Sequence, residues 1–300
     1  MRIAVIHEAA HPPTSSIEIL YAIKDKGVEA LYLRPSRLSC YITNGNIKFF
    51  YGLRELPPID AAIVRSLGFI TSLEQFVKRY TIIKLLELKG TLVINPVDSI
   101  TICRDKFLSL SILALNGVPV PETLITEVIP LAMSMSKNFG TFVLKPIIGS
   151  LGLGSLRLND VDMLFNIAKL YMVLNQPLYV QRYIKKPGRD IRILVVGEKI
   201  IGAIYRIAPS SDVWKTNIAQ GAKPQPAELD GELRELSIKT MKILRLHYAG
   251  IDIVEDKEDN KHRYKVIEVN ASPLWSGLKR ALGVEPAKEL VEYVIRLIRQ

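Results

Sequence analysis

The first hundred residues alternate short apolar runs with longer amphipathic stretches. The runs are rich in β-branched residues, as is typical of strands, and they cover residues 2–6, 30–33, 61–65 and 91–95. Between them, residues 15–27 and 72–90 place apolar side chains at helical spacing and end in glycine. Strands that alternate with helices predict a parallel α/β layer.

After residue 98 the pattern changes. Residues 99–117 predict one helix that ends at Asn116–Gly117, and residues 118–123 form an extended linker. The elements predicted next are a helix at 131–138, a strand at 141–146, a glycine-rich loop at 149–155, a strand over SLRL (155–158), a helix at 161–175 and a strand at 178–184.

The rest of the chain is predicted to be rich in β-structure. Two hairpins are expected, one at 190–208 around Gly197–Glu198 and one at 250–270 with its turn near Asp259–Asn260. Helices are expected at 231–248 and 284–300.

The composition indicates a globular protein and excludes several classes. Of the 300 residues, 48% are hydrophobic and 23% charged, which excludes a disordered or fibrous chain. Cys40 and Cys103 are the only cysteines, so neither a disulfide scaffold nor a thiolate zinc site is expected. No apolar run approaches the ~18 residues of a membrane span, and the N-terminus does not resemble a signal peptide. We therefore expect a cytoplasmic protein.

Positive charge is concentrated in one segment. The chain has 40 Lys and Arg against 30 Asp and Glu, a net charge of +10. Residues 182–223 contain nine basic and three acidic side chains, so more than half of the excess lies there. Such clustering predicts an anionic ligand, with a solvated charged surface as the alternative.

Three oxygen-bearing side chains gather on the hairpin at 250–270. Glu268 and Asn270 are two residues apart on a strand, so they share a face while Ile267 and Val269 point to the core. If the turn centres near residue 260, Asp252 lies opposite Glu268, with Cα atoms within about 5.5 Å. Like charges placed opposite each other destabilise a sheet, so a bound cation such as Mg²⁺ explains the set better than a solvent-facing pair.

A glycine-rich loop, GSLGLG at 149–154, follows the strand that carries Lys145. Glycines let backbone N–H groups approach phosphate oxygens, although the spacing is that of neither a Rossmann nor a Walker loop, and a flexible hairpin loop is the alternative. Lys145 alternates with Val143 on a strand that reads as buried, so it requires an anionic partner, which a phosphate would supply.

Other kinds of site lack support. His7 and His11 are four residues apart, but Pro12–Pro13 follow at once and argue against a helical metal site. There is no GxSxG element for a hydrolase and no nucleic-acid-binding signature. A nucleic-acid partner would rest on the basic segment alone.

Seven motifs occur together and in order: VLKP, GSLGLGS, YVQRYIKKPGRDIR, AIYR, WKTN, AGIDIV and EVNASP. This series resembles the ATP-grasp superfamily, and most of all the RimK-like ligases that attach glutamate or a similar amino acid to a carboxylate. It runs from about residue 98 to the C-terminus. The resemblance implies an α/β fold, with an N-terminal parallel domain at 1–97, a central ATP-grasp lobe at 98–184 and a C-terminal lobe with antiparallel strands at 185–300.

The resemblance also implies roles for individual residues. The expected ATP-binding residues are Lys106, Lys145, Ser150, Gly152, Gly154, Gln181, Arg182, Tyr183, Ile184, Asp190, Lys215, Thr216 and Asn217. Arg206 matches the catalytic arginine at the reacting phosphoryl group. Asp252, Glu268 and Asn270 match the ligands of Mg²⁺ or Mn²⁺, with two ions expected. Substrate contacts are expected at Arg192, Asn217 and Ser272.

The sequence departs from the family pattern in two places. Arg182 stands where the family usually has an acidic residue that helps to hold the nucleotide. Leu274 and Trp275 follow Pro273 where the family often has a glycine, so a reshaped acceptor pocket is expected.

The implied reaction is ATP-dependent amide formation through an acyl phosphate, which releases ADP and phosphate. Its substrates would be glutamate or 2-aminoadipate and a carboxylate on a protein C-terminus, an acidic carrier protein or a small coenzyme. A homo-oligomer is also expected, with neither a membrane nor a nucleic acid as partner. The alternative is a nucleotide- or carrier-binding protein of this family that has lost turnover.

Overall fold

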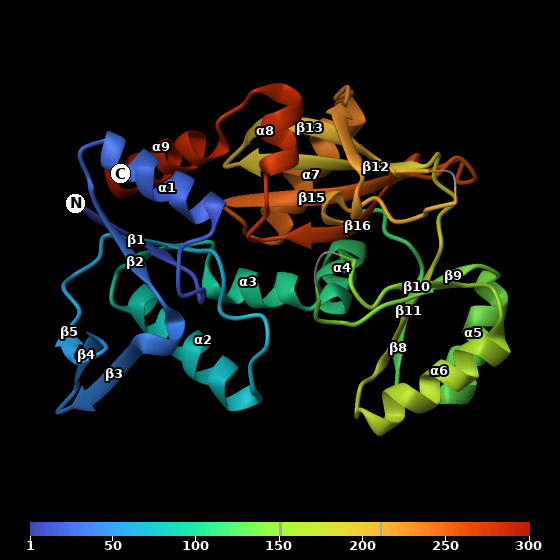
Figure 1. Cartoon of the computed structure of the whole chain (residues 1–300), viewed down its shortest axis with the longest axis horizontal. Coiled ribbons are helices and arrows are strands. Elements are labelled where there is room, and N and C mark those ends of the chain that lie inside the picture. The colour runs from blue at the N-terminus through green and yellow to red at the C-terminus, as the bar shows by residue number, and fades with distance from the viewer. Residues whose placement is uncertain (150–151, 211) are drawn as a thin grey trace.

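The computed structural model describes residues 1–149, 152–210 and 212–300. Its N-terminal sheet is parallel, in the order β2-β1-β6-β7. The strands are β1 (Arg2–Ile6), β2 (Glu29–Leu33), β6 (Ala61–Val64) and β7 (Leu92–Ile94). One face packs against α1 (Thr14–Asp25) and the C-terminal helix α9 (Pro286–Ile298), and the other against α2 (Leu73–Leu88) (Figure 1). The predicted parallel layer is confirmed.

An antiparallel unit that the sequence pattern did not predict follows β2. It consists of a 3₁₀ turn, η1 (Pro35–Arg37), and the strands β3 (Leu38–Thr43), β4 (Asn46–Tyr51) and β5 (Arg54–Glu55). β3 and β4 are joined at Asn44–Gly45, whose φ angles are 42° and 77°. Asn-Gly is the usual signal for such a turn, so the sequence did contain the information.

The single helix predicted at 99–117 is wrong, because two helices occupy this stretch. α3 (Val97–Arg104) ends before Asp105, and α4 (Lys106–Leu115) begins after it. The Asp105 carboxylate accepts hydrogen bonds from the backbone N–H groups of Phe107 and Leu108, each at 2.9 Å. Asp105 thus caps a new helix, and Lys106 becomes the first residue of that helix.

A small antiparallel sheet lies at one end of the molecule (Figure 1), with its strands in the order β10-β9-β11-β8. Its strands are β8 (Thr123–Thr126), β9 (Phe142–Leu144), β10 (Leu156–Leu158) and β11 (Leu178–Arg182). Side chains of α5 (Ile129–Phe139) and α6 (Val161–Val173) complete its core. Except for β8, these elements agree with the predicted ones.

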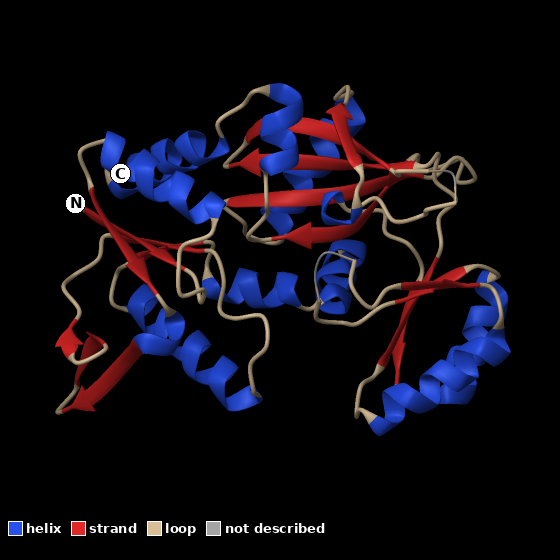
Figure 2. Cartoon of the chain, viewed as in Figure 1, coloured by secondary structure: helices blue, strands red, loops and turns tan. Residues whose placement is uncertain are grey.

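The large antiparallel sheet has the order β14-β13-β12-β15-β16 (Figure 2). Its strands are β12 (Arg189–Val196), β13 (Lys199–Ile207), β14 (Lys223–Pro226), β15 (Tyr248–Glu255) and β16 (Tyr264–Asn270). α4 and α7 (Gly231–Ile243) pack on one face. α8 (Ser276–Leu282) and α9 pack on the other, and a short 3₁₀ turn, η2 (Ile218–Gln220), lies beside α8.

The β15–β16 hairpin confirms the predicted pairing of Asp252 with Glu268. Closer to the turn, however, Ile253 pairs with Val266, so the register shifts and leaves Ile267 as an extra residue in a β-bulge. The prediction that Ile267 faces the core is therefore wrong. Its side chain is half-buried and lines a cavity beside Glu268, whereas Val266 takes the core position.

The architecture is mixed α/β, with one parallel sheet and separate antiparallel sheets, as predicted. The division into three domains at residues 97 and 184 stays a prediction. Among the residues that the structure describes, no helix has the length and apolar character needed to span a bilayer.

Candidate active site

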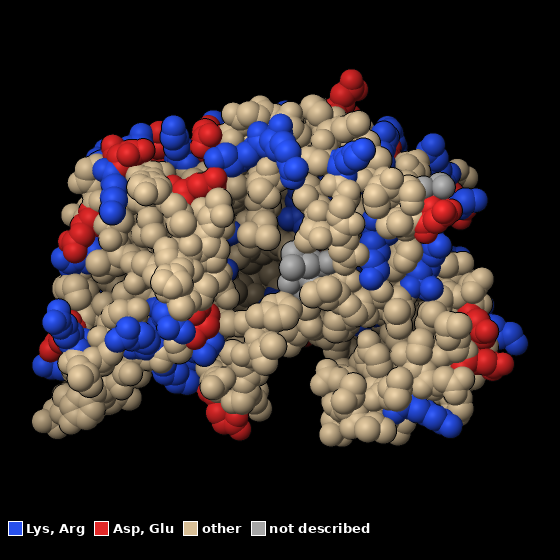
Figure 3. Space-filling model, viewed as in Figure 1, with Lys and Arg blue, Asp and Glu red and all other residues tan. Residues whose placement is uncertain are grey.

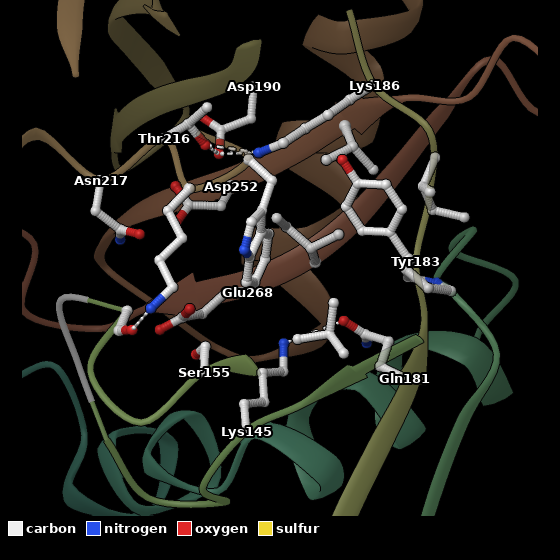
Figure 4. Close-up of a pocket in the computed structure, with 18 of the residues that line it drawn as sticks. Lys145, Ser155, Gln181, Tyr183, Lys186, Asp190, Thr216, Asn217, Asp252 and Glu268 are labelled. Carbon is white, nitrogen blue, oxygen red and sulfur yellow. Dashed lines mark hydrogen bonds and ion pairs between the residues drawn. The ribbon is translucent and has the colours of Figure 1, made fainter. Parts of the chain in front are cut away.

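Three cavities meet at Glu268. The inter-sheet cavity lies between the small and large sheets, and its lining includes Lys145, Gln181, Tyr183, Asp190, Thr216 and Glu268 (Figure 4). The α8 cavity is lined by Arg192, Arg206, Asn217, Asp252, Glu268 and Trp275, among others. The Arg104 cavity includes Arg65, Arg104, Lys106, Glu268, Asn270 and Ser272. Figure 3 shows one face of the molecule hollowed near its centre, with Lys or Arg atoms inside the hollow.

Arg206 joins two buried carboxylates. It donates to both oxygens of Asp190, at 2.7 and 2.9 Å, and its Nη2 lies 3.1 Å from Oδ2 of Asp252. Arg192 pairs with Asp252 through both Nε and Nη2. The pairing of β12 with β13 places Asp190 opposite Arg206, and the pairing of β12 with β15 places Arg192 opposite Asp252. The sheet register therefore builds this network of charges.

Asp190 has further partners in Lys186 and Thr216. The Lys186 Nζ is 3.5 Å from Asp190 Oδ2 and donates to the Thr216 hydroxyl at 2.7 Å, and that hydroxyl donates to Asp190. Burial alone would raise the pKa of Asp190, but the positive charges of Arg206 and Lys186 hold it below its usual value. Asp190 therefore stays ionised and fixes Arg206 at the junction of the inter-sheet and α8 cavities.

Glu268 and Asn270 have fewer side-chain partners among the described residues than Asp190 and Asp252 have. The Glu268 carboxylate forms neither a hydrogen bond nor an ion pair with any side chain in the described ranges, and the buried Asn270 Nδ2 also lacks a partner there. The described residues contain no cluster of three His, Cys, Asp or Glu side chains around one point. A divalent ion bound here would take oxygens from Asp252, Glu268 and Asn270 and fill its shell with water and phosphate oxygens, as Mg²⁺ commonly does. The donor set fits such an ion.

Lys145 follows β9 and points into the inter-sheet cavity (Figure 4). Its Nζ donates to Gln181 Oε1 at 3.1 Å and lies 5.0 Å from the centre of the Tyr179 ring. Burial lowers the pKa of Lys145 to about 8, and the attraction of Glu268 offsets this only in part. The positive charge of Lys145 is thus only partly balanced by nearby negative charge, and a bound phosphate would balance it.

Lys106 and the glycine-rich loop border the same cavity. Lys106 Nζ donates to the Gly149 carbonyl at 2.6 Å, which ties the start of α4 to the loop. Gly152 has a φ of +69°, and a Cβ added to it would lie 2.5 Å from Asn217 Oδ1. Only glycine allows this approach, which brings the loop against residues 215–217. Lys215 Nζ also donates to the Gly152 carbonyl, at 3.2 Å.

Arg182, the departure from the family pattern, has an acidic partner from elsewhere in the chain. Its guanidinium pairs with the Glu122 carboxylate, and its backbone N–H donates to the Glu122 carbonyl at 2.9 Å. The next residue, Tyr183, packs edge-on against Trp214, with ring centres 6.1 Å apart. A carboxylate therefore does lie beside position 182, although it comes from the linker before β8.

The structure brings most of the predicted site residues together. Those that line the inter-sheet cavity are Lys106, Lys145, Gly152, Gln181, Arg182, Tyr183, Ile184, Asp190, Arg206, Lys215, Thr216, Asn217, Asp252 and Glu268. Arg192, Asn270 and Ser272 line the α8 cavity. Gly154 lies outside these linings, and a Cβ added to it would lie 3.3 Å from Pro146 Cδ. Ser150 lies outside the described residues. The roles predicted for these residues stay predictions.

Sequence reasoning missed Lys186, Trp214, Arg65 and Arg104. Lys186 and Trp214 lie within the motifs YVQRYIKKPGRDIR and WKTN, so the motifs contained a usable signal. Arg65 and Arg104 belong to the N-terminal layer and α3, and no pattern in the sequence links them to the hairpin at 250–270.

The positive charge of the basic segment at 182–223 is partly neutralised in the folded structure. Acidic residues from other segments pair with several of its members: Arg182 with Glu122, Arg189 with Glu255, Arg192 with Asp252, and Lys199 with Glu289.

Comparisons with known proteins agree with this geometry. A family model described as a RimK-like ATP-grasp domain matches residues 103–294. The tetrahydromethanopterin:alpha-L-glutamate ligase of Methanococcus maripaludis is 30% identical over 305 residues, covering 100% of both chains. The alpha-aminoadipate–LysW ligase of Saccharolobus solfataricus is 34% identical over 72% of this chain and 78% of its own.

Solved structures show the same fold. The ATP-grasp ligase PsnB bound to a minimal precursor matches with a TM-score of 0.77 at 18% identity, covering 99% of this chain and 98% of its own. A RimK domain ATP-grasp protein from Sphaerobacter thermophilus matches with a TM-score of 0.73 at 20% identity, over 98% and 100% of the two chains. With a sequence match across the whole chain and a family model over most of it, the chain belongs to the RimK-like ATP-grasp family of ligases.

Proposed function

We propose that the protein joins L-glutamate, or a similar amino acid such as 2-aminoadipate, to a carboxylate on an acceptor, using ATP and releasing ADP and phosphate. The observation that carries this proposal is the junction of three cavities at Glu268, with Arg206 and Asp252 beside it. A ligase needs one place for the nucleotide and two for the substrates that it joins. These three places must share one reacting point.

The inter-sheet cavity suits the nucleotide. Lys145 and Lys106 supply positive charge for phosphates, and the backbone of the loop at Gly152 closes over the same space. Tyr183, Ile184 and Val143 provide apolar walls for a base. The terminal phosphoryl group would then lie toward Asp252 and Glu268.

A carboxylate has no usable leaving group, so it must be activated before an amine can replace one of its oxygens. In the proposed reaction an acceptor carboxylate oxygen attacks the γ-phosphorus, the bond from that phosphorus to the bridging oxygen breaks, and ADP leaves. The amine then attacks the acyl carbon, phosphate leaves with the C–O electron pair, and the nitrogen loses a proton. Arg206 faces the charge that builds up on the transferring group, and Asp190 keeps this arginine in position.

Asp252, Glu268 and Asn270 would hold Mg²⁺ or Mn²⁺, and the expected number of ions is two. When bound, such an ion neutralises phosphate charge and orients the γ-phosphoryl group. The like charges of Asp252 and Glu268 oppose each other across the hairpin, so a cation also stabilises this pair.

Two acceptors deserve the first tests, because relatives are named for them. A ligase named for tetrahydromethanopterin matches over the full length of the chain, and a ligase named for LysW matches over 72% of it. We would incubate the protein with ATP, Mg²⁺, L-glutamate or 2-aminoadipate, and either tetrahydromethanopterin or a peptide that carries the C-terminal residues of an acidic carrier protein. Mass spectrometry should show one acceptor heavier by the added amino-acid residue. If ATP is consumed and neither acceptor gains mass, both acceptor assignments are wrong.

Lys145→Ala should weaken binding of the ATP analogue AMPPNP by about 10- to 100-fold at pH 7, because a charged hydrogen bond to phosphate is lost. Burial sets the pKa of Lys145 in the free protein at about 8, and phosphate would raise it. Below that pH the lysine is already charged. Above it, binding must take up a proton, so the affinity of the unmodified protein should fall with rising pH, whereas that of the variant should not.

Calorimetry at pH 7 and pH 9 measures both effects. Lys169→Ala is the matched control, because its ammonium also lies over a ring, 4.3 Å from the centre of Phe165, but outside the cavity. Equal affinities for Lys145→Ala and the unmodified protein would place the phosphates elsewhere.

A further inference from the structure

The Arg104 cavity has an imbalance of charge that the α8 cavity lacks. Its lining contains three cations, Arg65, Arg104 and Lys106, and one carboxylate, Glu268. None of the three cations forms an ion pair with a residue in the described ranges: their hydrogen-bond partners are carbonyl and hydroxyl oxygens. The lining of this cavity therefore carries a net positive charge.

The α8 cavity is balanced by comparison. Its two arginines, Arg192 and Arg206, both pair with Asp252, and Glu268 adds a second carboxylate. The rest of its lining is largely apolar, with Leu194, Ile204 and Trp275 among its members. The α8 cavity therefore has less unbalanced positive charge for an additional anion to neutralise than the Arg104 cavity has.

Of the three cations, Arg104 has the most N–H groups without a hydrogen-bond partner among the described residues. It lies at the end of α3, half-buried, with Nη1 donating to the Gly68 carbonyl at 2.9 Å and its guanidinium 5.1 Å from the centre of the Phe76 ring. Its Nε and Nη2 have no partner among the described residues. Burial and the neighbouring charge of Arg79 lower the pKa of Arg104, as expected of a cation that lacks an anion. A carboxylate fits the open edge of this guanidinium.

Arg65 lies deeper in the same wall. It is 6% exposed, donates to the carbonyl of Pro273 at 2.7 Å, and its guanidinium is 4.6 Å from the centre of the Trp275 ring. Its charge thus sits between the Arg104 and α8 cavities, where a negative ligand on either side would stabilise it. Lys106 borders both this cavity and the inter-sheet cavity.

The outer rim of the cavity is apolar. Phe69 is 61% exposed and Ile148 is 55% exposed, and both contribute to the lining. A ligand that places its charged end against the cations would place its next atoms against these side chains.

From this arrangement, and resting on the proposed ligase function, we infer that the Arg104 cavity receives the acceptor through a dicarboxylate end. One carboxylate lies beside Lys106 and Glu268, where it is activated. The other pairs with Arg104, with the charge of Arg65 in support. The amine donor then approaches from the α8 cavity, on the other side of Glu268. Arg104 is in this account a specificity-determining residue that contacts the acceptor.

Two probes measure how much the second carboxylate contributes to the affinity of the acceptor. N-benzoyl-L-glutamate has an apolar ring and two carboxylates, and N-benzoyl-4-aminobutyrate lacks one of them. Calorimetric titration of the protein loaded with Mg²⁺ and AMPPNP gives both affinities without turnover. We expect N-benzoyl-L-glutamate to bind at least about 10-fold more tightly, because a charge-assisted pair is formed. Arg104→Gln should remove this preference while leaving the affinity for AMPPNP unchanged.

Arg37→Gln is the matched control, because Arg37 also lies 5.1 Å from the centre of an aromatic ring, that of Tyr51, but outside the cavity. The control should keep the preference. Equal affinities for the two probes in the unmodified protein, or a preference that survives Arg104→Gln, would overturn the inference. Because binding is measured without a product, a failure here is distinct from a failure of the proposed reaction, which would appear as absent ADP in the acceptor tests.

Discussion

Glu268→Gln should reduce turnover by roughly 10³-fold or more while the protein stays folded and still binds AMPPNP. The substitution keeps the shape of the side chain and removes one negative charge at the point where the three cavities meet. In the described structure this carboxylate has no hydrogen bond or ion pair to lose. Its charge opposes that of Asp252 across the hairpin but also attracts Lys145 and Lys106, so these two effects of removing it offset each other and the melting temperature should change little.

Steady-state ADP formation, AMPPNP calorimetry and thermal melting of the same preparation test this set of expectations. Glu258→Gln is the control, because it removes the same charge from an exposed position at the tip of the same hairpin. Its turnover should match that of the unmodified protein. Substantial turnover by Glu268→Gln, or by the unmodified protein in excess chelator, would rule out the proposed cation site.

Arg206→Lys should lower kcat by about 10²-fold and change the KM for ATP much less. The lysine retains a positive charge, so Asp190 and Asp252 are not left without a cation. It cannot, however, reproduce the two parallel hydrogen bonds to Asp190 or reach Asp252 at the same time. The lysine ammonium would therefore lie in the wrong place to stabilise the charge that develops on the transferring phosphoryl group.

Arg189→Lys provides the comparison for Arg206→Lys. Arg189 precedes Asp190 on β12 and pairs with a largely buried carboxylate, Glu255, at 3.0 Å, but it lies outside the three cavities. Its replacement by lysine should weaken an ion pair similar to that of Arg206 with Asp190 and leave kcat nearly unchanged. If both variants lose the same activity, Arg206 acts through the stability of the sheet, and its assignment to the reacting group is wrong.

The parts of the site that lie on one hairpin were predictable. The alternation of residues in KVIEVN and the position of the turn were enough to place Asp252 opposite Glu268. The same reasoning failed by one residue at Ile267, because a β-bulge changes the register and periodicity alone does not reveal it. The break between α3 and α4 was missed in the same way, since the apolar spacing continues through the capping residue Asp105.

Contacts between distant segments could not be derived from the pattern. The pairing of Asp190 with Arg206 depends on the register of β12 against β13, and that of Arg192 with Asp252 depends on β12 lying beside β15. Nothing in the local sequence specifies that third strand. Arg104 approaches Glu268 only after the N-terminal layer and the large sheet have packed together.

The nucleotide product is the most direct test of the account as a whole. With Mg²⁺, L-glutamate and a competent acceptor, the protein should form ADP, phosphate and the amide in equal amounts, because Lys145, Arg206, Asp252 and Glu268 line the inter-sheet cavity, where we propose that the terminal phosphoryl group binds. Chromatography of the nucleotides, together with phosphate and product quantification, measures all three. Activation by adenylation would instead give AMP and pyrophosphate. AMP as the main nucleotide product would contradict the proposed placement of the phosphates and the mechanism that depends on it.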